Sequence, residues 1–216
     1  MVHYGILTVM KSSSLPIRSS QVSRKALLRL YVAQGKSVRQ ISECLECSQN
    51  KINYWLEKYG IQKRTIADAM YQFKNPSGDP FALKSPKTVE EGILFGIGLG
   101  LYWGEGSKRG TGGVRLTNTD PRLLKKFIEF LEKTCSVRRN KLRFSVQIFE
   151  DLSEEKTLSY WSKELNVHRD QFYKVVVSKV RGVGTYRRKS EHGVVIVYVN
   201  NIKLKQLICS LIENIR

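Results

Sequence analysis

The sequence has few cysteines and histidines. Its four cysteines and three histidines are scattered over 216 residues. Cys44 and Cys47 form a C-x-x-C pair, but no second pair follows at the spacing of a zinc site, and Cys135 and Cys209 stand alone. We therefore expect no zinc and no disulfide framework, and interpret the cysteines as small buried side chains in a reducing cytosol.

Long apolar runs are missing as well. The longest, Ile93–Trp103, has about half of the roughly 20 residues that a transmembrane helix needs, so we expect no membrane partner. The first residues lack a basic start and a small-residue cleavage site, so we interpret residues 1–21 as a flexible tail and not a signal peptide. With 41% hydrophobic residues, the remainder is expected to form globular domains in the cytoplasm.

Acidic residues are scarce relative to basic ones. The chain has 37 Lys and Arg against 19 Asp and Glu, a net charge of +18, which indicates a polyanionic partner, most often nucleic acid. Residues 1–87 hold 14 basic and 5 acidic side chains, and residues 88–216 hold 23 and 14, so each part carries +9. We expect a nucleoid-associated protein with two surfaces that meet double-stranded DNA; the alternative is a soluble protein that is merely basic.

Residues 22–66 contain three short helical patterns separated by turn signals. Ser23 is a candidate N-cap for the first, which ends at Gly35; Ser37 begins a capping box with Gln40; and Ser48 caps a third helix that stops at Gly60. This pattern resembles a helix-turn-helix domain of the homeodomain-like or resolvase-like kind. The alternative is a small helical packing module with a solvated polar face.

The helix-turn-helix resemblance implies that the third helix enters the major groove. The side chains expected to face the bases are Gln49, Asn50, Lys51, Asn53 and Tyr54. Asn and Gln can pair bidentately with adenine. Arg39, Lys63 and Arg64 suit phosphate contacts, which position a protein without reading sequence.

Residues 67–87 concentrate Pro, Gly, Ser and Asp and are interpreted as a linker to a second domain at residues 88–216. This domain opens with a helix, capped by Thr88, in which Gly92, Gly96, Gly100 and Gly104 recur every four residues. Each glycine in a helix costs roughly 1 kcal/mol relative to alanine, so this face predicts a very close approach by another helix.

The end of this helix, Gly98–Gly106 with the sequence GLGLYWGEG, resembles the signature helix of the LAGLIDADG homing-endonuclease family. The resemblance implies a saddle-shaped sheet that lies on DNA. Because this chain has one signature helix, it also implies a homodimer in which Gly96, Gly100 and Gly104 form the dimer seam. Each subunit then supplies one acid, Glu105, to bind Mg²⁺.

The rest of the second domain alternates helices and strands. Strand patterns are found in Val114–Asp120, Leu142–Phe149, Phe172–Ser178 and Val194–Val199, with helices expected between and after them. The fold class is α+β: a three-helix helix-turn-helix bundle followed by a LAGLIDADG-like domain with a mostly antiparallel sheet. The polar face of the sheet is expected to present Arg115, Arg143 and Lys174. An extra helix near residues 153–165 and a very short first hairpin depart from the family pattern.

The candidate chemistry is metal-assisted phosphodiester hydrolysis around Glu105. Lys108 could neutralise the charge that builds on the phosphate. The basic run Arg187, Arg188 and Lys189 could do the same, although a solvated loop that grips DNA non-specifically explains it as well. Gln147, on the polar face of a strand, is a candidate for positioning water.

Two other functions remain open. A non-catalytic transcriptional regulator would use the LAGLIDADG-like domain for dimerisation and DNA grip, because fold resemblance alone does not prove chemistry. An RNA-processing role would require aromatic stacking platforms, for which Tyr102, Tyr173 and Tyr186 are the candidates.

Overall fold

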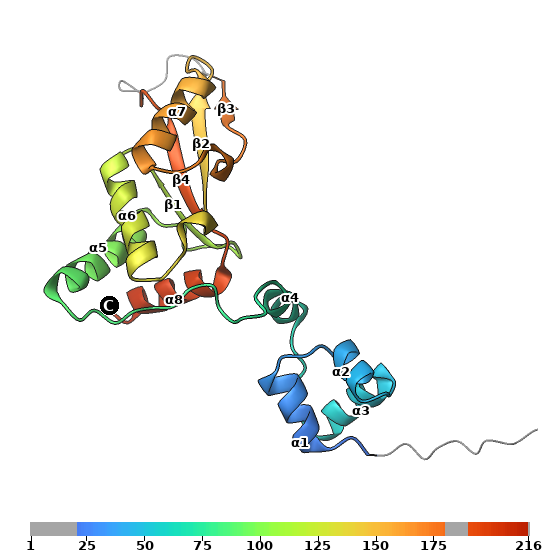
Figure 1. The fold of residues 1–216 in the computed structure, drawn as a ribbon. Coiled ribbons are helices and arrows are strands. Elements are labelled where there is room, and N and C mark those ends of the chain that lie inside the picture. The colour runs from blue at the N-terminus through green and yellow to red at the C-terminus, as the bar shows by residue number, and fades with distance from the viewer. Residues whose placement is uncertain (1–20, 180–189, 216) are drawn as a thin grey trace, which may run out of the picture. The chain divides into compact units, whose positions relative to one another are not determined.

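The computed structural model describes residues 21–179 and 190–215, and the chain divides into two compact units. Unit 1 ends at Gly78 and unit 2 begins at Asp79 (Figure 1). Nearly all of the predicted tail, at residues 1–20, lies outside the described residues, as does the run Arg187, Arg188 and Lys189. No helix in the described part of the chain is long and apolar enough to cross a membrane.

Unit 1 consists of helices, and its three predicted N-caps are confirmed. Ser23, Ser37 and Ser48 each accept a hydrogen bond from a backbone N–H of the following turn, and Ser37 and Gln40 form the expected capping box. One helix differs from expectation, because its second half is π-helical. The elements are α1 (Arg24–Leu27), η1 (Leu28–Ala33), α2 (Val38–Cys44), α3 (Gln49–Lys58) and α4 (Ile66–Lys74).

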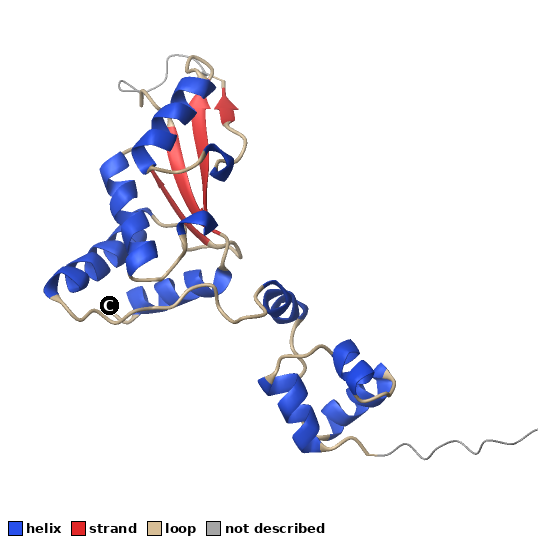
Figure 2. Ribbon diagram, viewed as in Figure 1, coloured by secondary structure: helices blue, strands red, loops and turns tan. Residues whose placement is uncertain are grey.

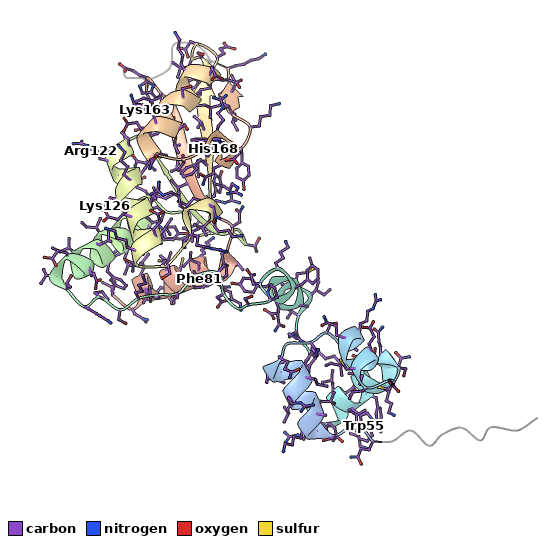
Figure 3. The ribbon with its side chains drawn as sticks, viewed as in Figure 1. Trp55, Phe81, Arg122, Lys126, Lys163 and His168 are labelled. Carbon is purple, nitrogen blue, oxygen red and sulfur yellow. The ribbon has the colours of Figure 1, made fainter. Side chains whose placement is uncertain are left out.

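Unit 1 has a small core. Leu27, Ile41, Ile52 and Leu56 are completely buried, and Trp55, labelled in Figure 3, packs against this core from the side. The phenol of Tyr59 donates a hydrogen bond to the carbonyl of Val22 and so ties the start of the bundle to the end of α3. The first three helical segments therefore form a self-contained bundle.

Unit 2 combines helices with one four-stranded sheet, so the fold is mixed α and β (Figure 2). Thr88 caps its helix as predicted, and Asp120 and Ser153 cap two further helices, the first of which has Pro121 at its first position. The elements are α5 (Val89–Glu105), β1 (Val114–Asn118), α6 (Pro121–Lys133), η2 (Arg139–Lys141), β2 (Leu142–Phe149), α7 (Glu154–Leu165), η3 (Arg169–Gln171), β3 (Val176–Ser178), β4 (Val194–Val199) and α8 (Ile202–Glu213).

The strand order is β1-β4-β2-β3, and the sheet is mostly antiparallel, as expected. β4 lies between β1 and β2 and is antiparallel to both, whereas β3 is a parallel edge strand on β2. The third strand is shorter than predicted: it begins at Val176, and Phe172 makes an isolated bridge to Phe144.

The two faces of the sheet differ in burial. Leu116, Val197 and Phe144 form one row across the strands and are fully buried in the core that the sheet shares with the helices. Residues of the alternate register, such as Arg115 and Gln147, are exposed. Because successive side chains of a strand point to opposite faces, one face holds the core and the other stays open.

Residues 79–87, assigned to the linker from the sequence, pack on unit 2. The N–H groups of Ala82 and Lys84 donate to the carbonyls of Cys135 and Thr134 at the end of α6. Phe81, labelled in Figure 3, is partly buried against the unit 2 core. Contacts of this kind depend on residues far away in the sequence, so composition alone predicts a loop for this segment.

Candidate nucleic-acid interface

The glycine face of α5 is open. A Cβ atom built on Gly92, Gly96, Gly100 or Gly104 would meet nothing within 4 Å. Ile93, Ile97 and Trp103 are exposed beside these glycines, so the face is an apolar stripe with a bare backbone along it. Within unit 2, no described residue explains why this face lacks side chains.

Gly98 is the glycine of α5 that packs inside the subunit. A Cβ atom on Gly98 would lie 2.1 Å from two ring carbons of Phe130 on α6. The absence of a side chain at Gly98 therefore lets α5 and α6 approach closely within unit 2. The four-residue glycine repeat did not predict this contact, because Gly98 lies outside the repeat.

The turn that follows Glu105 is fixed by its neighbours. Gly106 bridges Leu116 at the outer edge of β1, and a Cβ atom there would collide with the Tyr102 carbonyl, 2.4 Å away. The carbonyl of Ser107 accepts a hydrogen bond of 3.0 Å from the Tyr102 hydroxyl. Burial raises the pKa of Tyr102 to about 12, so the hydroxyl stays protonated and keeps donating. Glu105 is thus carried by a well-defined turn at the edge of the sheet.

Glu105 itself is exposed at the C-terminal end of α5. No salt bridge or side-chain hydrogen bond engages its carboxylate among the described residues. A carboxylate at this end of a helix meets the partial negative charge of the backbone carbonyls, which disfavours it. Lys108 offsets part of that charge, because its ammonium donates to the carbonyl of Trp103 in the last turn.

Lys205, which sequence analysis missed, supports the loop after Glu105. It is a lysine of α8 that is only 4% exposed, and its ammonium donates to the carbonyls of Arg109 and Gly110 at 2.8 and 2.9 Å. The signal was present in the sequence, since Lys205 falls in line with Ile208 and Ile212 on the buried side of α8.

Two predicted arginines come together on the open face of the sheet. Arg115 on β1 and Arg143 on β2 both pair with Tyr198 of the intervening β4, so the three side chains form one row. The Arg115 guanidinium lies 5.4 Å from the centre of the Tyr198 ring and also reaches Gly112, in the loop after Glu105. Arg115 neighbours Leu116, which Gly106 bridges directly after the acid.

Aromatic rings extend this row. Tyr173 packs edge-on against Tyr198 at 5.7 Å, and its hydroxyl accepts a hydrogen bond from Asn200. Lys174 is exposed next to Tyr173, but it precedes β3 and is not part of a strand. Of the other aromatic candidates, Tyr102 is fully buried and cannot stack on a base, and Tyr186 lies outside the described residues.

Gln147 is separated from Glu105 within one subunit. It lies four residues beyond Arg143 on β2 and donates to the hydroxyl of Ser178. Four residues along a strand span about 13 Å, and β2 is two strands, or about 10 Å, away from β1. The register therefore places Gln147 on the same open face but not beside the acid.

In unit 1, the outward half of α3 carries the predicted base-reading residues. Gln49, Asn50 and Tyr54 are exposed, and Lys51 and Asn53 are half-buried. The ammonium of Lys58 lies 4.7 Å from the Trp55 ring and donates to the Tyr54 hydroxyl. This face thus combines side-chain amides, two lysines, Lys51 and Lys58, and the exposed phenol of Tyr54.

The predicted phosphate contacts of unit 1 divide into two kinds. Lys63 is exposed, and Arg39 is exposed while it pairs with Glu43 one turn along α2. Arg64 differs: its guanidinium donates to the carbonyls of Gly35 and Lys36 and lies 4.2 Å from the Tyr31 ring. Arg64 therefore holds the bundle together, a role that its charge does not reveal in the sequence.

The described residues contain no group of three or more His, Cys, Asp or Glu side chains that could hold a metal ion. Mg²⁺ is usually bound through one or two carboxylates together with water and substrate phosphates. An exposed, unengaged Glu105 fits one such ligand. The chain matches no family model, no curated protein and no solved structure.

Proposed function

We propose that this chain binds double-stranded DNA as a homodimer and is a LAGLIDADG-type endonuclease or a derivative of one. The observation that carries the proposal is Glu105, which ends an open glycine face directly before Gly106, the residue that bridges β1, the strand of Arg115. A bare helix face favours close packing with an identical helix. Two such helices bring two copies of Glu105 together next to two basic sheets.

DNA binding is supported by the way basic groups are placed in both units. Exposed amides on α3 suit base edges in the major groove, while Arg39, Lys63 and Lys174 are exposed and suit phosphates. On the sheet, Arg115 beside Tyr198 provides a contact for the DNA backbone. Arg143 can add a second contact only by giving up the carbonyls of Asn140 and Leu142, to which its guanidinium donates. The net charge of +18 adds long-range attraction to the polyanion.

In the proposed reaction, the two copies of Glu105 would hold Mg²⁺ at the dimer seam. The bound ion would supply an activated water for attack on phosphorus and would stabilise the leaving oxygen. Lys108 and Arg115 would bind and orient the phosphate, and Lys205 would hold the backbone of the loop between them. Gln147 would contact DNA along the sheet instead of positioning water at Glu105 of its own subunit.

The test is Mg²⁺-dependent nicking or cutting of supercoiled DNA that carries the gene's own flanking sequence. Glu105→Gln should abolish cleavage while binding survives, because the amide keeps the shape of the side chain but loses its charge. Glu213→Gln, which neutralises an exposed acid on α8, is the matched control and should cleave like the wild type. Binding by the wild type that does not weaken steeply with rising salt would contradict a DNA-binding function.

The second candidate is a non-catalytic DNA-binding regulator. It is favoured by the position of Lys108, whose ammonium caps α5 and so is already engaged at the Trp103 carbonyl. A regulator needs the glycine face and the basic surfaces but no acid at the seam. Specific binding by the wild type with no cleavage under any divalent cation would decide for the regulator.

The homodimer has its own test in solution. Gly100→Leu fills the open face of α5, where a side chain meets nothing in one subunit, so the variant should fold but lose dimerisation. Light scattering coupled to size exclusion should then give the dimer mass for the wild type and the monomer mass for the variant. A monomeric wild type would remove the shared acid pair from the proposal.

A further inference from the structure

The short helix α4 carries a second exposed apolar stripe. Ile66, Met70 and Phe73 fall on one side of the helix and are 86%, 49% and 81% exposed. No residue of α4 is buried, although three of its nine residues are large and apolar. Isolated helices shorter than about 12 residues are marginal in water, so a helix of this kind needs a partner on its apolar face.

The opposite side of α4 is anchored to unit 1. Thr65 caps the helix by accepting from the Asp68 N–H, and its hydroxyl donates to the Asp68 carboxylate at 2.7 Å. The side chain of Gln72 lies against Gly35, so closely that it occupies the place of a Cβ atom there. Because Arg64 and Gln72 both reach the end of the first helical segment, the helix is held with its apolar stripe turned away from the bundle.

Charge argues against nucleic acid as the partner of this stripe. Residues 65–83 contain two acidic side chains and one basic side chain, in a chain whose net charge is +18. Binding of nucleic-acid phosphates requires basic side chains. Two copies of a strongly basic protein repel each other least where basic side chains are few. The neutral stripe therefore suits a second copy of this chain.

The size of the stripe shows what such a contact can do. Three side chains of this kind provide about 300–400 Å² per copy. Two copies would bury about 600–800 Å² in total, less than the roughly 1,200 Å² of a stable interface. The contact is too small to hold a dimer alone, but it would strengthen one that another contact already holds.

We propose that α4 pairs with α4 of a second copy, as an auxiliary contact in the homodimer that α5 forms. The inference rests on the proposed homodimer. A two-fold axis across α4 makes the two helices antiparallel, so Met70 meets its own copy and Ile66 meets Phe73 of the other subunit. Since α3 and α4 belong to the same unit, this contact fixes the spacing of the two α3 helices and hence of two DNA half-sites.

The test combines cross-linking with mass measurement on the full chain. Met70→Cys is made in a Cys44→Ser background, which removes the exposed native thiol, and is oxidised at low protein concentration. It should give a disulfide-linked dimer. Glu57→Cys in the same background, exposed on α3, is the control and should stay monomeric on a denaturing gel. The double variant Ile66→Glu/Phe73→Glu should dimerise at least about ten-fold more weakly.

The outcomes separate this inference from the proposed function. Both substituted side chains of the double variant are exposed, so the fold of unit 1 does not depend on them. A wild-type dimer in which Met70→Cys fails to cross-link would overturn the α4 contact and leave the α5 dimer intact. A wild type that is monomeric by light scattering would overturn both. Unchanged dimer affinity in the double variant would also overturn the α4 contact, because the exposed stripe would then have a role other than binding a second copy.

Discussion

Units 1 and 2 are similarly basic but are stabilised differently. Unit 1 has 12 basic and 4 acidic side chains, and unit 2 has 25 and 15. The buried apolar core described in unit 1 has 8 residues, whereas the core of unit 2 has 27. Small domains bury a smaller fraction of their surface and are marginally stable, so unit 1 depends more on individual polar anchors.

The same comparison separates structural charges from ligand-binding ones. Arg64 in unit 1 and Lys205 in unit 2 both donate to backbone carbonyls of a neighbouring segment. Arg39 and Arg115 instead present their charge on the surface. In a basic protein, a lysine or arginine is thus a strong candidate for DNA contact only when the structure shows that its charged group is exposed and not bound to backbone carbonyls.

The largest effect is expected from a core truncation in unit 1. Ile52→Ala removes a fully buried side chain and should cost about 2–5 kcal/mol, enough to unfold most of this small unit. Trp55 reports on unit 1 alone, since the other tryptophans are Trp103 and Trp161 of unit 2. Its fluorescence should change while the far-ultraviolet signal of unit 2 persists. Simultaneous loss of both signals would show that the units fold as one.

Two glycines of α5 should respond in opposite ways. Gly98→Ala drives a methyl group into Phe130 and should destabilise unit 2 by up to about 3 kcal/mol. Gly96→Ala meets nothing in its own subunit and should stabilise the isolated helix by up to about 1 kcal/mol. Urea unfolding of both variants measures the difference. Destabilisation of Gly96→Ala with loss of the dimer mass would mean that a second subunit covers this face, whereas destabilisation with an unchanged mass would mean that the face is occupied within the subunit.

Truncating the buried lysine should loosen the loop beside the acid. Lys205→Met leaves the carbonyls of Arg109 and Gly110 without their donor and should cost about 1–2 kcal/mol in unit 2. Amide hydrogen exchange should quicken in residues 107–113, while unit 1 is unaffected. Lys203→Met, on the exposed side of the same helix, serves as the control; similar losses in both variants would contradict a specific role for Lys205.

Measurements of DNA affinity should show that substituting a residue that contacts bases changes sequence discrimination, whereas substituting a residue that contacts phosphates changes affinity for all sequences. Asn50→Ala on α3 should reduce discrimination between target and random DNA by about ten-fold. Lys63→Ala should weaken binding to all sequences and lower the salt slope by about 1. Titrations at several salt concentrations give both quantities. A uniform loss in Asn50→Ala would remove α3 from the base-reading role.

The smallest effect is expected from thiol labelling, which compares a cysteine of unit 1 with a cysteine of unit 2. Burial raises the pKa of the Cys135 thiol to about 12, so almost no thiolate is present at neutral pH. Cys44 is exposed and should react quickly with a thiol reagent. Cys135 should react only when unit 2 unfolds, which mass spectrometry of the labelled peptides can follow. Rapid labelling of native Cys135 would show that the unit 2 core opens readily.

Local signals in the sequence predicted much of the fold. Ser37 with Gln40, and Ser48, predicted helix starts correctly because capping depends on residues within one turn. The alternation of apolar and polar residues in Leu142–Phe149 predicted a strand, because this signal also depends on residues that are close in the sequence. Residues 79–87 could not be placed on unit 2 from the sequence, since their partners at the end of α6 are about 50 residues away along the chain.

The candidate site shows the same division. The sequence by itself determined the glycine repeat, the position of Glu105 at a helix end and the excess of basic residues, because these depend on composition and spacing. The tertiary structure alone decided that Gly98, and not the repeat, contacts Phe130, that Arg64 and Lys205 hold carbonyls, and that Gln147 lies away from Glu105. These facts depend on strand register and helix packing, which join residues far apart in the chain.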